Sequence, residues 1–261
     1  MKIPKFITCL AFILIGSFFG CSTVPRDSLH NYSEGKLFTD QEAIAFKGAS
    51  SRPWRLKYAV TRDHGDDAEF FATVHQQDKM YAASIYARFG DRLRLLKRLT
   101  AGTDGDDRNS SFLEPNFFWT TPKNDSWQKL IRIPELFAGT GHLIEEHIFV
   151  IDQGTTRNGI RDIPKLEEVE FIPAWTSFQE HLEGNVGLQG EYNTFTEDGL
   201  NFVFAFWKEE NGTISVAGKV AGTYKLERKP DGGWRISMDT FKREPFTDDD
   251  WHARGLRSST Q

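Results

Sequence analysis

The chain has 261 residues, of which 39% are hydrophobic, and its 32 basic and 37 acidic side chains give a net charge of −5. This length is enough for one large domain or two small ones with a real core. Acidic and basic residues are interspersed, which disfavours a nucleic-acid partner because phosphate backbones bind basic faces.

The first twenty residues have the layout of an export signal. Lys2 and Lys5 form a short positive region, and residues 6–19 are apolar apart from four positions. A helix that spans a bilayer needs roughly 20 apolar residues. The shorter run here favours a cleavable signal over the alternative, a permanent transmembrane anchor.

Residues 18–21 read Phe-Phe-Gly-Cys. They resemble the lipobox of bacterial lipoproteins, in which Gly or Ala precedes an invariant Cys, with Phe18 standing where Leu is usual. The resemblance implies cleavage before Cys21, a lipid on its sulfur and acylation of the new amino terminus. With Ser22 rather than Asp after the cysteine, it also implies a place on the periplasmic face of the outer membrane. The alternative is a secreted protein in which Cys21 is incidental.

Processing at this site would change both charge and redox chemistry. Loss of Lys2 and Lys5 makes the net charge of −5 more negative by two. The chain has two cysteines; Cys9 would leave with the signal and Cys21 would carry the lipid. The mature domain would then hold no free thiol, which excludes disulfides, cysteine nucleophiles and cysteine-ligated metals. We expect membrane contact through the anchor and no cofactor.

The chain divides into a signal (1–20), a polar lipidated tether (21–38) and a globular domain (39–261). The domain begins with a helix candidate at 39–47, because Thr39 and Glu42 have the spacing of a capping box and Gly48 ends the pattern. A second short helix is predicted at 176–182.

Strand signals extend from residue 54 to residue 242, as short runs of aromatic and β-branched residues between turn residues. Asn211-Gly212 has the composition of a hairpin turn. Phe202, Phe204 and Phe206 alternate with Val203, Ala205 and Trp207, which predicts a central strand covered on both faces. The predicted strands are 54–61, 69–75, 80–89, 93–100, 130–134, 143–152, 167–173, 188–194, 201–207, 214–227 and 234–242.

These signals predict a mainly β fold with one or two short helices. The fold is either one antiparallel meander or two β subdomains divided near residues 153–166. Residues 101–125 are expected to form a long loop, a length that is uncommon unless the loop is functional or mobile. The basic stretch 92–98 (RLRLLKR) is interpreted as a strand with its cations toward solvent.

Two sequence features suggest metal sites, but neither has the required spacing. His142 and His147 in HLIEEH are five residues apart, which matches no helical zinc motif and places them on opposite faces of a strand. We therefore expect an edge or surface position for this stretch. A calcium loop at Asp104, Asp106 and Asp107 lacks the glycine and glutamate of an EF-hand. The favoured interpretation is a solvated turn, with a non-EF calcium site as the alternative.

The seven Trp and 22 Phe residues are the most distinctive feature of the composition. The rings of Trp54, Trp207 and Trp234 suit strands and are expected in the core. Tryptophans predicted in loops or at the terminus are candidates for a recognition surface, because Trp is enriched at binding hot spots. These are Trp119, Trp127, Trp175 and Trp251.

Two functional hypotheses follow. The first is a non-enzymatic binding or assembly module, lipid-anchored in the cell envelope, with an envelope protein or a glycan as partner. The alternative is a lipid-anchored periplasmic hydrolase acting on glycan or peptide, although the sequence contains no nucleophile or phosphate-loop motif. Two carboxyl groups about 5 to 10 Å apart in a cleft would favour the hydrolase.

Overall fold

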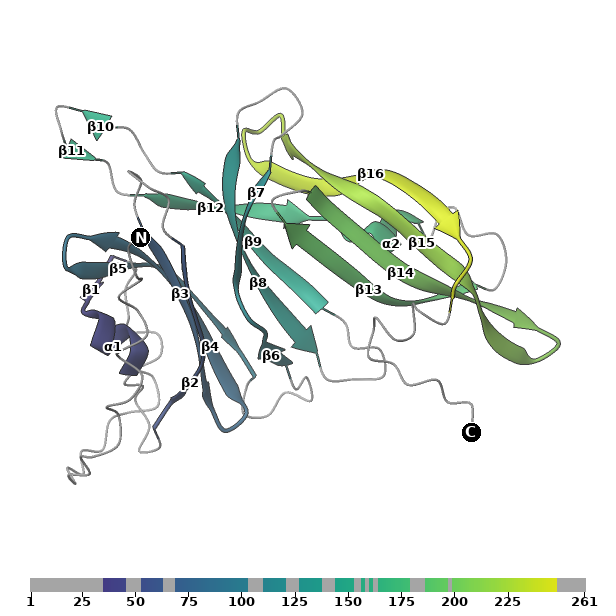
Figure 1. The fold of residues 1–261 in the computed structure, drawn as a ribbon, viewed down its shortest axis with the longest axis horizontal. Coiled ribbons are helices and arrows are strands. Elements are labelled where there is room, and N and C mark those ends of the chain that lie inside the picture. Colours follow the sequence, from purple (N-terminus) through teal and green to yellow (C-terminus); the bar gives the residue numbers. More distant parts are fainter. Residues whose placement is uncertain are drawn as a thin grey trace, which may run out of the picture.

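The computed structural model describes residues 35–45, 53–62, 69–102, 110–120, 127–137, 144–152, 156–157, 160–161, 164–178, 186–196 and 199–247. These residues form a mainly β fold with two short helices, as the sequence predicts (Figure 1). Among them, every strand pair is antiparallel except the one between Lys165–Phe171 and Trp234–Glu244.

The first sheet has five strands in the order β1-β5-β4-β3-β2. Four of them follow one another as a meander, and the two-residue β1 pairs with the start of β5. Their bounds are β1 (Leu37–Phe38), β2 (Arg55–Arg62), β3 (Phe70–Gln77), β4 (Met80–Phe89) and β5 (Arg92–Ala101).

The second sheet has nine strands in the order β13-β14-β15-β16-β12-β9-β8-β6, and β7 pairs with the other half of the same edge of β8. A separate two-stranded ribbon joins β10 (Thr156–Arg157) to β11 (Ile160–Arg161). The nine strands are β6 (Ser110–Phe112), β7 (Asn116–Thr120), β8 (Gln128–Phe137), β9 (Ile144–Asp152), β12 (Lys165–Phe171), β13 (Val186–Thr196), β14 (Gly199–Glu210), β15 (Thr213–Arg228) and β16 (Trp234–Glu244).

The five-stranded sheet packs against one face of β8 and β9, while the rest of the nine-stranded sheet curls away from it (Figure 1). Because successive side chains of a strand point to opposite faces, β8 and β9 contribute to two cores. Leu130 and Ile148 belong to the cluster of buried residues inside the curled part of the nine-stranded sheet, which we call the half-barrel core. Ile131 and Phe149 belong to the inter-sheet core.

The half-barrel core is rich in aromatic rings and is covered by α2 (Ala174–Phe178). The Tyr224 hydroxyl accepts a hydrogen bond of 2.9 Å from the Ala174 amide at the start of this helix. Phe202 and Phe204 of β14 are buried here, and on the other face Ala205 is buried while Val203 and Trp207 are half-buried. The predicted burial of both faces of β14 therefore holds in part.

The helix α1 (Asp40–Ala45) covers the outer face of the five-stranded sheet. Its start is the capping box that the sequence predicts. The Glu42 amide donates to Thr39 Oγ1 at 3.1 Å, and the Thr39 amide donates to Glu42 Oε2 at 2.7 Å. These bonds satisfy amide groups that a helix leaves without partners in its first turn.

The prediction of one long loop at residues 101–125 is wrong, because β6 and β7 lie within it. They have three and five residues, too few to give a clear alternating pattern, and both exist because β8 offers them a pairing edge. Residues 153–166, where the sequence suggested a division between subdomains, follow β9 and include β10, β11 and the start of β12. The strands β9 and β12 pair with each other in one sheet.

Candidate ligand cleft between the two sheets

A cleft of about 440 Å³ lies where β5, at one end of the five-stranded sheet, faces β12 of the curled sheet. Figure 1 shows β12 beginning next to β5 before it continues into the curled half. The cleft is lined by Gly35, Arg94, Leu95, Leu96, Lys97, Phe149, Pro164, Lys165, Leu166 and Glu168.

The floor of the cleft is apolar. Phe149 is only 1% exposed and is part of the inter-sheet core. Leu96 of β5 and Leu166 of β12 pack against that core and remain partly exposed. The cleft is therefore a place where the core between the sheets opens to solvent, with a leucine from each sheet at its border.

The rim of the cleft is cationic. Arg94 is half-buried and Lys165 is exposed, and neither forms an ion pair or a side-chain hydrogen bond with another described residue. Lys97 also lines the cleft, and Glu168 is the only carboxylate among the described lining residues. Three cations against one carboxylate give the lining a net positive charge, which suits an anionic ligand.

One wall of the cleft depends on Gly35. Its φ of +96° is a left-handed conformation that glycine adopts readily, and a Cβ built there would lie 3.1 Å from Nη2 of Arg94. The Gly35 amide donates to the Leu95 carbonyl at 2.8 Å, and the Leu95 amide donates to the Lys36 carbonyl at 2.9 Å. The absence of a side chain at Gly35 thus lets the Arg94 guanidinium pack against the Gly35 backbone beside β5.

The sequence alone does not predict this site. The basic stretch 92–98 is a strand, as expected, but its cations do not all face solvent. In the structure, Arg98 is half-buried and donates to Ser84 Oγ at 3.0 Å, while Arg94 and Lys97 line the cleft. A local signal existed in the excess of cations on an otherwise apolar strand. The facing residues Lys165 and Leu166 are 70 residues away in the chain, and no local pattern connects them.

The edge or surface position expected for the HLIEEH stretch holds in part. Residues 144–147 belong to β9 and pair with β8, whereas the pairing of β9 with β12 covers only residues 149–152. Glu145 is exposed. Glu146 is buried and His147 is half-buried, while His142 lies outside the described residues. The burial of Glu146 and the partial burial of His147 depart from the expectation, because charged residues normally indicate exposure, whereas here each of these two side chains has a partner on β8.

The first of these partners is Arg132, which forms a two-pronged ion pair with Glu146. Arg132 Nε and Nη2 lie 2.6 and 2.7 Å from the two carboxylate oxygens, and the Glu146 side chain has no exposed surface. Asn193 Nδ2 donates a third bond at 3.2 Å, and the guanidinium lies 4.9 Å from the centre of the Phe195 ring. This arrangement neutralises a buried charge on the half-barrel side of the sheet.

The second pair lies on the opposite face, where His147 Nε2 and Glu135 Oε2 are 2.8 Å apart. Burial alone would raise the pKa of Glu135, but hydrogen bonds from His147 and Ser110 outweigh it and lower the pKa below its ordinary value. Burial opposes the charged form of His147, and its pKa is nevertheless raised by the bond to Glu135 and by the charges of Glu135, Glu145 and Glu168.

These two pairs form neither a histidine-activated serine nor the two-carboxylate arrangement of a hydrolase. Glu135, rather than His147, accepts the hydrogen bond from Ser110, so His147 is not placed to take a proton from that hydroxyl. Glu135 and Glu146 are adjacent along the two strands but point to opposite faces, one toward each core. They therefore cannot act on the two sides of one glycosidic bond.

A third polar group is buried beneath α1. His75 Nε2 lies 2.8 Å from the Ile44 carbonyl at the end of that helix. Burial chiefly lowers the pKa of His75, and the charge of Arg98 lowers it further, against the opposing effect of the bond to Ile44. The buried hydroxyls of Thr73 and Tyr86 on the same face have no hydrogen-bond partner among the described residues. The neutral imidazole therefore holds α1 on the sheet.

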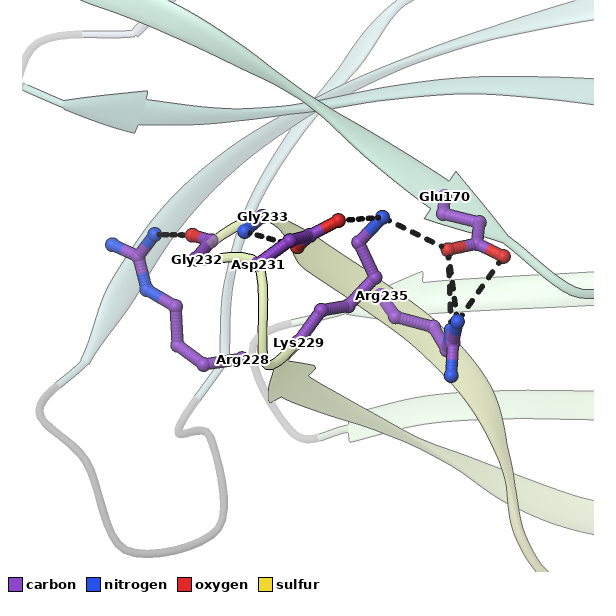
Figure 2. Close-up of polar contacts among 7 residues, drawn as sticks. All are labelled: Glu170, Arg228, Lys229, Asp231, Gly232, Gly233 and Arg235. Carbon is purple, nitrogen blue, oxygen red and sulfur yellow. Dashed lines mark hydrogen bonds and ion pairs between the residues drawn. The ribbon is translucent and has the colours of Figure 1, made fainter.

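A surface network of charges fastens the turn between β15 and β16 to β12 (Figure 2). Glu170 of β12 accepts from Arg235 at 3.1 Å and pairs with Lys229 at 3.2 Å. Lys229 also pairs with Asp231 at 3.2 Å, and Asp231 accepts from the Gly233 amide at 2.9 Å. Each charge in this network has a partner, so we assign it to the docking of the hairpin on β12.

The three candidate tryptophans that the structure describes lie on different segments of the chain. Trp119 lies on β7 rather than in a loop, with Lys129 Nζ 4.7 Å from its ring centre. Its neighbour Phe118 faces the half-barrel core, so Trp119 points to the other side of the sheet. Trp175 lies in α2 and packs against the half-barrel core. Trp127 is 62% exposed, and Trp251 lies outside the described residues.

The tryptophans predicted for the core are largely there. Trp234 is 1% exposed and Trp54 is 8% exposed, while Trp207 is half-buried. Cys21 and the acidic group Asp104, Asp106 and Asp107 lie outside the described residues, so lipidation and a calcium site stay predictions.

Within the described residues, no cluster of three or more His, Cys, Asp and Glu side chains is arranged to hold a metal ion. None of the helices in this part of the chain is long and apolar enough to cross a membrane. In comparisons with known proteins, the chain matches no family model, no curated protein and no solved structure.

Proposed function

We propose that this protein is a non-enzymatic binding module of the cell envelope, anchored by lipid on Cys21, that takes an anionic ligand in the cleft between β5 and β12. One observation carries the proposal. Arg94 and Lys165 flank an apolar floor without a carboxylate partner in the described structure, whereas the other polar groups described above mostly pair with one another.

The physical reason is the cost of holding like charges together. Two cations from different sheets repel each other and gain from a shared anion, especially beside a low-dielectric floor. The cleft volume of about 440 Å³ lies within the roughly 300–1,000 Å³ of small-molecule sites, which combine apolar walls with a few polar groups. The site thus has the chemistry of a binding cleft.

Binding can be tested with the fluorescent anion 8-anilinonaphthalene-1-sulfonate, which carries one sulfonate and an aromatic body. The protein is the whole chain from residue 21 with Cys21→Ser, so that its own lipid does not compete. We expect saturable binding that is weakened at least fivefold by Arg94→Gln or Lys165→Gln. Lys57→Gln, an equal charge change on the exposed strand β2, is the matched control. Equal binding by all four proteins would contradict the proposal.

The anchor has its own test. Cys21→Ser should move the processed domain from the membrane fraction to the soluble fraction, or leave the signal uncleaved, because two or three acyl chains hold a protein on a bilayer far more firmly than one. Fractionation and immunoblotting measure this. A processed variant that stays with the membrane would show that Cys21 is not the anchor.

A further inference from the structure

The composition of the cleft identifies a class of ligand more narrowly than its charge does. Resting on the proposed function, that the cleft binds an anion, we propose that the ligand is an anionic lipid with one acyl chain. Its head group lies between Arg94 and Lys165, and its chain lies over Leu96 and Leu166 toward Phe149.

The apolar floor calls for a chain as well as a charge. A small anion would satisfy the two cations and leave the exposed parts of Leu96 and Leu166 in water. An acyl chain covers both leucines and reaches the ring of Phe149, which already belongs to the inter-sheet core. Because apolar burial drives association in proportion to the area removed from water, each methylene that contacts the floor increases the affinity.

The volume limits the ligand to one chain. At about 440 Å³, the cleft is near the lower end of the roughly 300–1,000 Å³ seen for small-molecule sites. It also opens to solvent between β5 and β12, so a chain can enter from the side while the head stays at the rim. A lipid with two chains would leave one of them in water.

The position of the cleft in the chain supports a membrane source for this lipid. Gly35 forms part of its wall, and it lies within the segment 21–38 that is expected to begin at the lipid anchor, Cys21. Fourteen residues, fully extended at about 3.3–3.6 Å each, span at most about 50 Å. Under the proposed anchoring, the cleft therefore stays within that distance of a bilayer that supplies single-chain lipids.

A series of alkyl phosphates with methyl, butyl, octyl and dodecyl chains tests the inference, because the head group stays constant. Dissociation constants are measured by calorimetry, below the micelle concentration of each compound, on the Cys21→Ser chain from residue 21. We expect each added methylene that reaches the floor to tighten binding by about two- to fourfold. Dodecyl maltoside, which has the same chain without a charge, should bind at least tenfold more weakly than dodecyl phosphate.

Variants separate the head site from the chain site. Leu96→Gln and Leu166→Gln should weaken the binding of dodecyl phosphate at least tenfold and leave the binding of methyl phosphate unchanged. Lys165→Gln should weaken the binding of both compounds. The matched control is Leu56→Gln, at a leucine of β2 that is 38% exposed. It should change neither affinity, and far-ultraviolet circular dichroism confirms that each variant folds.

The outcomes distinguish this inference from the proposed function. If methyl phosphate binds as tightly as dodecyl phosphate and Lys165→Gln weakens both, the cleft takes a small anion and only the lipid inference is overturned. If no alkyl phosphate binds, the proposed function is overturned with it. If affinity increases with chain length but is unchanged in all the cleft variants, the ligand binds elsewhere. That result would overturn both the lipid inference and the proposed function.

Discussion

Glu146 is a carboxylate with no exposed side-chain surface, and the structure shows what makes that position tolerable. The Arg132 guanidinium donates two short hydrogen bonds to it, and Asn193 donates a third. A buried ion pair of this kind adds little net stability over a well-packed apolar pair. Removing one partner is costly, because the other charge is then left in a low-dielectric interior.

Replacing Arg132 with methionine should therefore destabilise the protein strongly. The variant keeps most of the side-chain volume and leaves Glu146 buried without its counter-charge, so we expect a loss of about 3–5 kcal/mol in the free energy of unfolding by urea. The double variant Arg132→Met/Glu146→Leu should recover much of the loss, and Arg55→Met on exposed β2 should cost little. A single variant as stable as the wild type would refute this account of the pair.

The Glu135 and His147 pair predicts a specific dependence of stability on pH. The pKa of His147 is raised above 6.5, so its contribution is complete below 6.5 and is lost as pH rises through the folded-state pKa. The pKa of Glu135 is lowered below 4.5, so its contribution is complete above 4.5 and is lost as pH falls through the folded-state pKa. The pair stabilises most between pH 4.5 and 6.5.

His147→Gln tests this. The difference in unfolding free energy between wild type and variant should be greatest between pH 4.5 and 6.5, at about 1.5 kcal/mol, and should shrink on both sides of that window. His75 has the opposite effect, because its lowered pKa costs stability in acid. This effect cancels in the difference, since His75 is present in both the wild type and the variant. A difference that does not change with pH would mean that the pair is uncharged in the folded protein.

At the scale of elements, β14 and β15 are held close by glycines opposite aromatic rings. Gly222 pairs with Phe202 and Gly218 pairs with Phe206. A Cβ at Gly222 would lie 2.5 Å from the Phe202 ring and 2.1 Å from the Thr240 carbonyl oxygen. The rings therefore cover the glycine backbone, and β15 can stay in register with both neighbours only if this position has no side chain.

Gly222→Ala should consequently lower the free energy of unfolding by about 3 kcal/mol or more, at the upper end of overpacking effects. Urea denaturation should show this as a lower midpoint with an unchanged slope. The control is Gly212→Ala in the turn between β14 and β15. A Cβ there meets nothing within 4 Å, but φ is +77°, so the cost is that of a left-handed alanine, about 1–2 kcal/mol. Equal costs at the two positions would show that the contact with Phe202 is not the reason for the glycine.

At the scale of the whole molecule, β8 and β9 join the two cores. Leu130 and Ile131 are consecutive residues whose side chains lie in the half-barrel core and the inter-sheet core respectively. A strand pair with one face in each core cannot leave one core intact while the other unfolds. The arrangement predicts that both sheets unfold as one cooperative unit.

Leu130→Ala and Ile131→Ala test that prediction. Each should cost about 2–5 kcal/mol and shift one single transition, with coincident curves from far-ultraviolet circular dichroism and tryptophan fluorescence. The contrary result would be a biphasic curve in which Leu130→Ala moves one phase and Ile131→Ala the other, which would show that the two cores unfold separately.

Patterns of neighbouring residues predicted a large part of the secondary structure. Met80–Phe89 has the bounds expected of it, and each end of the other ten predicted strands lies within three residues of the observed end. The capping box of Thr39 and Glu42 forms as expected. Such features depend on backbone geometry and on side chains a few residues apart, so their causes are visible in a short stretch of sequence.

The sequence by itself thus determined that this is a mainly β protein with one or two short helices, and it predicts a lipid anchor at Cys21. Only the tertiary structure decided that β6 and β7 exist, that Glu146 is buried and His147 half-buried, and that Arg94 and Lys165 line one cleft from different sheets. The physical reason is that these features depend on partners far away in the chain. A strand edge, a counter-charge or a facing wall acts only after folding has brought it near, and no local pattern records it.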